Sequence, residues 1–499
     1  MKKPNFAYFL LLLIFIGGVL ASCNAVKTKA NELRFGFTTE PTTLNPLNPS
    51  NTADGRSILF NIFEGLVKPN VDGTFFPCLA ESWTIDRGSL VYNFVLREGV
   101  FFHDNSIVTA ADVKFSLDTA KEAGFDGLKN VKEVEITDDN KIKIILNNAD
   151  PEFLPYLTIG ITKADNTDRE KNIIGTGPFY VESYTPQRNL ILSNFNKYWQ
   201  QGLPHLEKIT IVFFANYDTL MVALRGGSID SAFITGAMAV QLDHRDFDVF
   251  NNRSAAVQLM ALNNAAPPFD DIRVRQAINY GIDVNGIIES AFFGSGSPSG
   301  SPIIPGLSVY YEDSLSYKYN PDLAMELLSQ AGFNNSNKLS MEISVPSNFS
   351  MHVDTAQVIA GQLEKIGVNA NIRLVDWSTW LTDIYFGRQY QATIISLDSP
   401  SISPRSFLTR YQSDSGSNFI NFKNSGFDKV YNAALTETDI DKRIRLYKDA
   451  QRIITENAAS VYIQDIFSFI VFRGGAFSGA LDYPLYVIDF ASIYGINNN

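Results

Sequence analysis

Side chains that could carry out catalysis are few and scattered in this sequence. The 499-residue chain has four histidines and two cysteines. The histidines stand far apart, and none belongs to a His-x-x-x-His or Glu-x-x-His pair of the kind that holds zinc: His103, His205, His244 and His352. A Gly-x-Ser-x-Gly nucleophile elbow is absent from the sequence. The pattern predicts no catalytic residues, no metal site and no cofactor, so we do not expect an enzyme.

Two motifs resemble chemistry but favour structural roles. His103-Asp104 could offer two metal ligands, yet Asn105 follows, and the three residues form a polar turn that closes a hairpin. Gly175-Thr176-Gly177-Pro178 is rich in glycine like a phosphate-binding loop. It lacks the Gly-Lys-Ser/Thr ending of such a loop, and Pro178 removes an amide that a phosphate would need. We therefore expect both motifs to build turns.

Residues suited to binding a ligand are more plentiful. Aromatic residues make up 12% of the chain, which suits an aromatic cleft or a large core. Glu40 lies in a proline-rich polar loop directly after the strand-like run 33–37, where sheet edges form clefts. The other candidates gather between residues 377 and 418: Trp377, Trp380, Tyr385, Asp398, Arg405, Tyr411 and Asn418. The two tryptophans could stack on a ligand or pack inside the protein.

The elements around the second group read as alternating strands and helices. Strand patterns cover residues 339–345, 368–374 and 392–397, and helical patterns cover 353–366 and 378–386. Helical crossovers imply parallel strands in this region. Further strand patterns cover residues 259–263, 461–463 and 467–472, and Asn320 with Pro321 forms an N-cap and first-turn pair that opens another helix. Another module lies at 77–118, where a strand over 90–96 leads to a turn and then to Thr109-Ala-Ala-Asp112, a capping box that opens a helix.

The N-terminus reads as a targeting segment. Lys2 and Lys3 precede an apolar run over residues 6–20, and Leu20-Ala21-Ser22-Cys23 ends it. A run this short at the terminus is typical of a signal peptide rather than a spanning helix. Small residues before Cys23 match a bacterial lipobox, so we expect lipidation at Cys23 and an extracytoplasmic, membrane-anchored protein. Cys78 would then be a lone buried thiol.

The remaining chain is too long for one ordinary core, so two or three domains are expected. The formal net charge of −12 and the pI of about 5.0 argue against a nucleic-acid partner.

Several stretches resemble one known family. The motif "LAESW…LREG…FHD…TAADVKFSL" in residues 77–118, "GTGPF" followed by Asn196-Lys197-Tyr198-Trp199, and "PPFDDIRVRQAINYGID" at 267–283 are similar to solute-binding proteins of peptide/nickel-type ABC importers. The resemblance covers essentially the whole chain after the N-terminal segment. It implies an α/β fold with two lobes (periplasmic-binding-protein type II, cluster C), mixed sheets and a small α+β subdomain in the first lobe.

The resemblance also implies boundaries and partners. We expect a signal peptide at 1–22, a tether at 23–32, lobe I at 33–50, 171–258 and 474–499, an inserted subdomain at 51–170, and lobe II at 259–473. The expected function is capture of a solute, foremost a peptide, between the lobes of a monomer and its delivery to a membrane permease. Alternatives are a surface sensor or adhesin, or a binder of an oligosaccharide or a chelated metal; a hydrolase would need a catalytic cluster in the cleft.

The candidate site departs from the family pattern. Peptide-binding relatives place an Asp that holds the ligand's ammonium group just after a strand, behind a motif similar to "GW--D". Asp398 falls about two residues early, and Leu397 replaces the tryptophan. An arginine that relatives often carry on the preceding helix is missing, since Ile384 or Tyr385 occupies its place. The sequence therefore leaves the identity of the ligand open.

Overall fold

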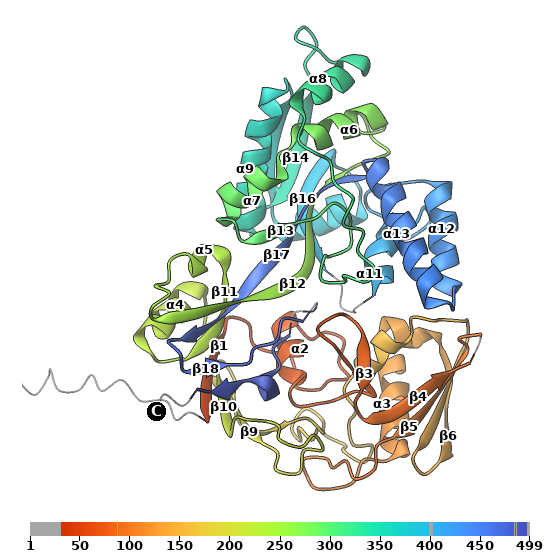
Figure 1. The fold of residues 1–499 in the computed structure, drawn as a ribbon, viewed down its shortest axis with the longest axis vertical. Coiled ribbons are helices and arrows are strands. Elements are labelled where there is room, and N and C mark those ends of the chain that lie inside the picture. The colour runs from red at the N-terminus through yellow and green to blue at the C-terminus, as the bar shows by residue number, and fades with distance from the viewer. Residues whose placement is uncertain (1–30, 87, 399–402, 484, 486, 497–499) are drawn as a thin grey trace, which may run out of the picture.

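The computed structural model describes residues 31–86, 88–398, 403–483, 485 and 487–496. The predicted signal peptide, Cys23 and most of the predicted tether lie outside the described residues. The described chain forms two bodies stacked along its long axis, and two long strands run between them (Figure 1). These strands are β12 (Phe247–Leu262) and β17 (Ser460–Arg473), which pair antiparallel over most of their length.

One mixed sheet runs through both bodies. Its strand order is β15-β14-β16-β12-β17-β11-β1-β10-β9-β8, with β13 (Gly296–Pro298) paired to β17. The part of the sheet in the first body contains β1 (Glu32–Phe37), β8 (Phe179–Thr185), β9 (Asn189–Asn194), β10 (Lys208–Phe213) and β11 (Ser231–Thr235). β1 pairs parallel with both β10 and β11, whereas β9 pairs antiparallel with β10.

Short helices and strands complete the first body. They are α2 (Ala53–Leu59), α4 (Tyr217–Gly226), α5 (Gly236–Ala239), the 3-10 helix η5 (Phe490–Ser492), β18 (Phe477–Ser478) and β19 (Tyr494–Gly495). Phe35, Phe37 and Phe233 lie in its core and contact one another edge-on or tilted. The C-terminal strands thus return to the body in which the described chain begins (Figure 1).

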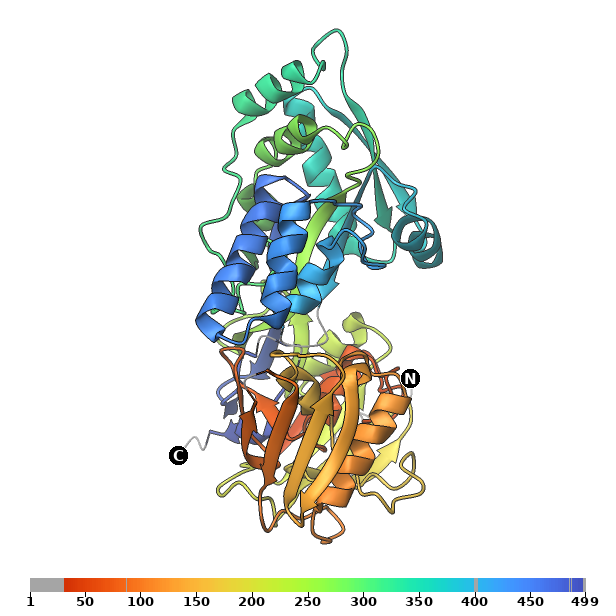
Figure 2. The same cartoon turned by 90° about the vertical axis from the view of Figure 1, so that its right-hand side faces the viewer.

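A separate antiparallel sheet forms the small subdomain. Its strand order is β4-β5-β7-β6, and the helix α3 (Ala110–Glu122) accompanies it (Figure 2). The strands are β4 (Ala80–Ile85), β5 (Val91–Leu96), β6 (Val131–Asp138) and β7 (Lys141–Leu146). Beside them lie β2 (Val67–Pro69), β3 (Phe75–Pro77) and the 3-10 helices η1 (Asp126–Asn130) and η2 (Leu154–Thr158). Thr109 and Asp112 form the predicted capping box, so that prediction is confirmed.

The second body contains the predicted parallel strands. β14 (Ser340–Pro346) pairs parallel with β15 (Asn369–Val375) and with β16 (Ala392–Asp398), which confirms the parallel arrangement. The helices here are α6 (Ile272–Gly281), α7 (Val284–Phe292), α8 (Pro321–Gln330), α9 (Ser350–Lys365), α10 (Trp377–Thr379), the π-helix η3 (Trp380–Phe386), α11 (Pro404–Leu408), the 3-10 helix η4 (Thr409–Tyr411), α12 (Ser425–Thr436) and α13 (Ile440–Glu456). The helix predicted to begin at Ser378 instead begins after the N-cap Asp376.

The α/β architecture with two bodies, mixed sheets and a small α+β subdomain confirms the predicted fold class. Helices α12 and α13 stand directly above the subdomain (Figure 2). This arrangement makes the contact between the two bodies the place to look for a ligand site.

Candidate functional site

A cavity of about 1070 Å³ lies between the two bodies. The first body and its subdomain supply the loop around Thr38 and Thr39, helix α2 and the segments 124–128 and 155–160. The second body supplies Tyr385, Asp398 and Arg410, among others. Aromatic and aliphatic side chains cover much of the wall, and a few charged groups face the same space, as in typical ligand sites.

Asp398 and Arg410 are the cavity's most informative charged pair. Asp398 is the last residue of β16, is exposed, and lies opposite Ala256 of β12. Arg410 donates from its guanidinium to the carbonyl oxygens of Ser406 at 3.1 Å and Asp398 at 3.0 Å. Among the described residues, the Asp398 carboxylate has no hydrogen bond or ion pair, and Arg410 has no carboxylate partner. Both charged side chains line the same cavity.

Three of the predicted aromatic residues form one stack. The rings of Trp377 and Trp380 are nearly parallel, with centroids 5.0 Å apart, and Tyr385 continues the stack 5.8 Å beyond Trp380. Trp380 is 2% exposed and donates from Nε1 to Thr393 Oγ1 at 2.9 Å. Of the three, only Tyr385 lines the cavity. The tryptophans thus support Tyr385 from behind.

A π-helix carries Tyr385. The segment η3 follows α10, and such wider turns occur mostly as short insertions, often at functional sites. Tyr385 also packs against Phe419, with ring centroids 5.2 Å apart. The ring is held from two sides while its third side faces the cavity.

The other predicted residues lie away from the cavity wall. Glu40 accepts hydrogen bonds from the Tyr184 hydroxyl at 2.5 Å and from the Gln187 amide at 2.9 Å. Tyr411 is fully buried in the core of the second body. Asn418 is also buried, and its side-chain amide donates to the carbonyl oxygens of Gln412 and Phe422. These contacts tie loops together within one body.

Arg405 lines the cavity but faces a carboxylate of the subdomain. Its Nη1 donates to Asp150 Oδ2 at 2.8 Å, and its Nη2 pairs with Asp150 Oδ1. Burial opposes the charge of Arg405, but the hydrogen bonds and charge of Asp150 outweigh it and raise the pKa of Arg405. The charge of Arg405 is therefore balanced by Asp150, whereas Arg410 has no carboxylate partner in the described part of the chain.

Sequence reasoning missed Arg410, Asp150 and Glu152. Arg410 stands in the segment that joins Asp398 to Phe419, and a basic residue there was the available signal. Asp150 and Glu152 flank Pro151 near the start of a short helix, which resembles ordinary capping. Their pairing with residues more than 250 positions away has no local signature.

The two structural motifs fold against each other. His103 Nδ1 accepts a hydrogen bond from the Gly175 amide at 3.2 Å, so Nε2 carries the proton and donates to the Gly177 carbonyl at 3.0 Å. Burial lowers the pKa of His103 to about 4. Neither motif is left to bind a metal or phosphate. Within the described ranges no group of three or more His, Cys, Asp or Glu side chains could hold a metal ion.

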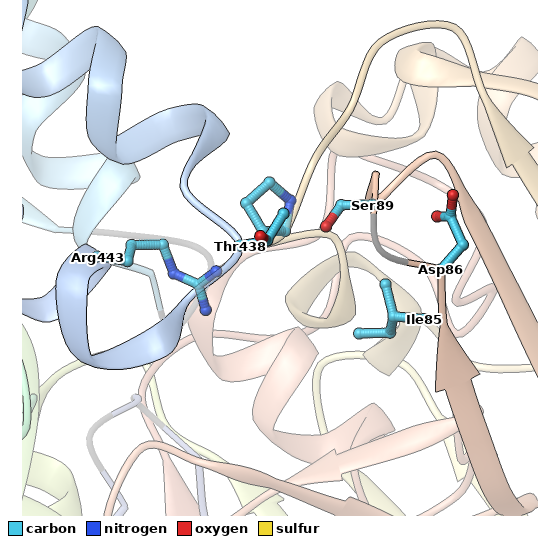
Figure 3. Close-up of a pocket in the computed structure, with 6 residues that line it drawn as sticks. Ile85, Asp86, Ser89, Thr438 and Arg443 are labelled. Carbon is cyan, nitrogen blue, oxygen red and sulfur yellow. The ribbon is translucent and has the colours of Figure 1, made fainter.

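A second, smaller cavity of about 430 Å³ lies where the subdomain meets the second body. The β4–β5 turn contributes Ile85, Asp86 and Ser89, while Thr438 and Arg443 approach from the opposite side (Figure 3). The Asp86 carboxylate accepts hydrogen bonds from the backbone amides of its own turn. We assign no ligand to this cavity.

No helix in the described part of the chain is both long and apolar enough to cross a membrane. Two stacked bodies with a ligand-sized cavity between them define a two-lobed binding protein. Comparisons with known proteins identify the family. The model for the middle region of bacterial extracellular solute-binding proteins, family 5, matches residues 74–419, which is more than half of the chain. The chain therefore belongs to the family 5 solute-binding proteins of ABC importers.

Individual relatives agree. The chain is similar to "Heme-binding protein A" of Haemophilus influenzae, with 29% identity over 424 residues that cover 77% of each protein. It is also similar to "Glutathione-binding protein GsiB" of Salmonella paratyphi A, with 27% identity over 447 residues that cover 83% of this chain and 85% of the relative. A solved structure, DppA of Helicobacter pylori in complex with the peptide STSA, matches with a TM-score of 0.73 and 25% identity, covering 93% of this chain and 98% of DppA.

These relatives are binding proteins by name, which confirms that the chain is a substrate-binding protein and not an enzyme. The family is described as extracellular, so an extracytoplasmic location follows at that level.

Proposed function

We propose that this protein is a lipid-anchored binding component of an ABC importer and that its ligand is a zwitterion, foremost a short peptide. The observation that carries the proposal is that Asp398 and Arg410 both line the cavity and that neither forms an ion pair with a described residue. A carboxylate suits a ligand's ammonium group, and a guanidinium suits a ligand's carboxylate. A ligand with both groups would use both residues.

The volume of the cavity suits a ligand at the large end of the range of small molecules, such as a short peptide. Its volume of about 1070 Å³ lies slightly above the range of about 300–1,000 Å³ for typical small-ligand sites. Phe60, Phe125, Tyr156 and Tyr217 share the wall with Tyr385, so side chains of varied shape could pack there. The ligands named for two relatives, glutathione and the peptide STSA, carry ammonium and carboxylate groups.

Arg410 supplies a guanidinium in place of the arginine that relatives often carry on the helix before β16. The arginine expected on the helix before β16 is replaced by Ile384 or Tyr385. Arg410, on the far side of Asp398 in the sequence, presents a guanidinium to the same cavity. We assign to it the carboxylate of the ligand, and to Tyr385 an apolar or planar part of the ligand.

The anchor and the permease complete the proposal. Lipidation at Cys23 would hold the protein on the outer side of the membrane, where a permease could receive the ligand from the monomer. Replacing Cys23 by Ser should release the protein from the membrane fraction into the soluble fraction. Equal membrane association of the variant would remove the anchor from the proposal.

The decisive experiment identifies the ligand. Protein purified without denaturation is unfolded, the released small molecules are identified by mass spectrometry, and the affinity of the identified ligand is measured by calorimetry. We expect a compound with an amino group and a carboxylate. D398N and R410M should each weaken its binding by about 10- to 100-fold, because each removes a hydrogen bond between charged groups.

The matched control is D139N, which changes an exposed acid of the subdomain far from the cavity lining. Its affinity should equal that of the natural protein. A co-purified ligand that lacks an amino group, such as an oligosaccharide, would contradict the zwitterion proposal. Uptake of the identified ligand can then be compared between cells with and without the protein. Equal uptake in both would favour a sensor or adhesin instead.

A further inference from the structure

Charged and polar side chains from the subdomain and from the second body meet beside the ligand cavity. The subdomain contributes Asp150 and Glu152, which flank Pro151, and the second body contributes Ser403, Arg405 and Arg443. Ser403 is the N-cap of α11, and its hydroxyl oxygen also accepts a hydrogen bond from the backbone amide of Arg405. Arg443 belongs to α13.

The contacts join residues that are distant in sequence and are largely buried. Arg405 makes a two-pronged pair with Asp150, whose side chain is 5% exposed. The Ser403 hydroxyl donates to Glu152 Oε2 at 2.6 Å, and Arg443 Nε lies 3.7 Å from Glu152 Oε1. Burial raises the pKa of Glu152, and the charge of Arg405 and the bond from Ser403 oppose that rise. Two carboxylates thus face two guanidiniums across one junction.

We propose that these five residues form a latch that holds the two bodies in the arrangement of this structure, and that it acts whether or not a ligand is present. Arg405 and Tyr156, one from each side of the junction, both line the ligand cavity. Closing the latch therefore completes the cavity wall. Opening it separates Arg405 from Asp150 and opens that wall.

The energetics suit a reversible contact. A two-pronged arginine–carboxylate pair fixes the relative orientation of the groups that carry it. Desolvation offsets much of the attraction in a buried ion pair, so the intact pair adds little net stability. Removing one partner is different, because the remaining charge would be buried alone. The latch therefore sets the geometry of closure without preventing release of the ligand.

This role distinguishes Arg405 from Arg410. Arg405 is a positioning residue that acts through Asp150, whereas Arg410 is left for the ligand. The latch goes beyond the proposed function, since its action does not depend on which solute binds.

Hydrogen–deuterium exchange of the full chain, without added ligand, tests the latch. D150N should speed exchange in residues 403–411, on the unchanged side of the junction, by roughly tenfold, because charged hydrogen bonds are lost there. R405M should do the same in residues 150–156. Exchange in residues 340–375, which form β14, α9 and β15, should stay unchanged and shows that the second body remains folded.

D139N is the control and should change neither segment. If each variant speeds exchange only in its own segment, or in neither, the latch is refuted and the residues merely support their own loops. If D150N disturbs the subdomain as a whole, R405M decides, because its effect must appear at 150–156 across the junction. Since no ligand is added, this result stands apart from the outcome of the ligand search.

Discussion

Protonation of one buried histidine should make the second body sensitive to acid. His352 lies in the first turn of α9, is 2% exposed, and its Nδ1 lies 3.0 Å from Gln258 Nε2. Gln258 Oε1 accepts from Gln464 Nε2 at 2.8 Å, so Gln258 Nε2 is a donor and His352 Nδ1 must accept. Burial lowers the pKa of His352 from the ordinary value of 6.5 to about 4. A proton on Nδ1 would in addition face the amide hydrogens of Gln258.

The sign and size follow from proton linkage. Between pH 6.5 and pH 4 the unfolded chain binds a proton at His352 that the folded protein does not bind. Stability is therefore lost as the pH falls through this window. From pH 7 to pH 5 the loss amounts to about 2 kcal/mol for this one histidine. Glu64 and Glu152 act in the opposite direction, because burial raises the pKa of each carboxyl group.

The substitution H352N isolates the histidine. The Asn side chain can place its oxygen near the position of Nδ1 and still accept from Gln258, but it does not titrate. Urea unfolding at pH 7 and pH 5 should show that the natural protein loses about 2 kcal/mol more than H352N over this interval. The carboxyl groups are the same in both proteins and cancel in the difference.

H244N is the control, because His244 is exposed. Its pH profile should follow that of the natural protein. Parallel profiles for the natural protein and H352N would refute the reasoning and would mean that His352 is not held neutral by its surroundings.

Four further substitutions test the packing and the cavity wall. G177A should destabilise the protein by about 1–3 kcal/mol in thermal unfolding, because the added Cβ would lie 2.6 Å from the Asn61 carbonyl oxygen. G361A should instead stabilise the protein by about 0.5–1 kcal/mol, because Gly361 lies in α9 and an added Cβ would meet open space. W380F should lower the free energy of unfolding by about 1–3 kcal/mol through loss of the bond to Thr393, and an unchanged value would contradict the assigned contact. Y385A should weaken ligand binding measured by calorimetry while changing the unfolding midpoint less than W380F does, since Tyr385 is only half-buried.

Local patterns predicted the elements well where the chain follows ordinary rules. The capping box at Thr109 and Asp112 and the N-cap Asn320 with Pro321 occur as expected. The strands 340–346, 369–375 and 392–398 are parallel, as the helical segments between the predicted strands imply. Each of these features depends on neighbours within a few residues.

The long strands between the bodies were harder to recognise. The sequence predicted a strand over 259–263 and two strands over 461–463 and 467–472, whereas β12 covers Phe247–Leu262 and β17 covers Ser460–Arg473 without interruption. The prediction of two separate strands in β17 is therefore wrong. Gln464 and Asp465 break the apolar pattern, yet both are fully buried. Polar residues at such positions look like a turn in the sequence because their partners are distant.

The candidate site shows the same limit. Aromatic residues between 377 and 385 were recognisable as a group, but only packing distinguishes Trp380, behind the stack, from Tyr385, on the cavity wall. The boundaries of the lobes stay predictions, because β12 and β17 pass through the junction as continuous strands.

The polar network on these two strands has a mechanical consequence. The pairing of β12 with β17 shifts register twice, once between Arg253 and Val257 and again between Gln258 and Leu259. Irregularities of this kind locally bend and twist a strand pair. Gln258 and Gln464 join the two strands beside the second shift, and His352 ties Gln258 to α9. Bending between the two bodies should therefore concentrate on the part of β12 before Gln258, while the proposed latch at Asp150 and Arg405 holds the other end of the junction.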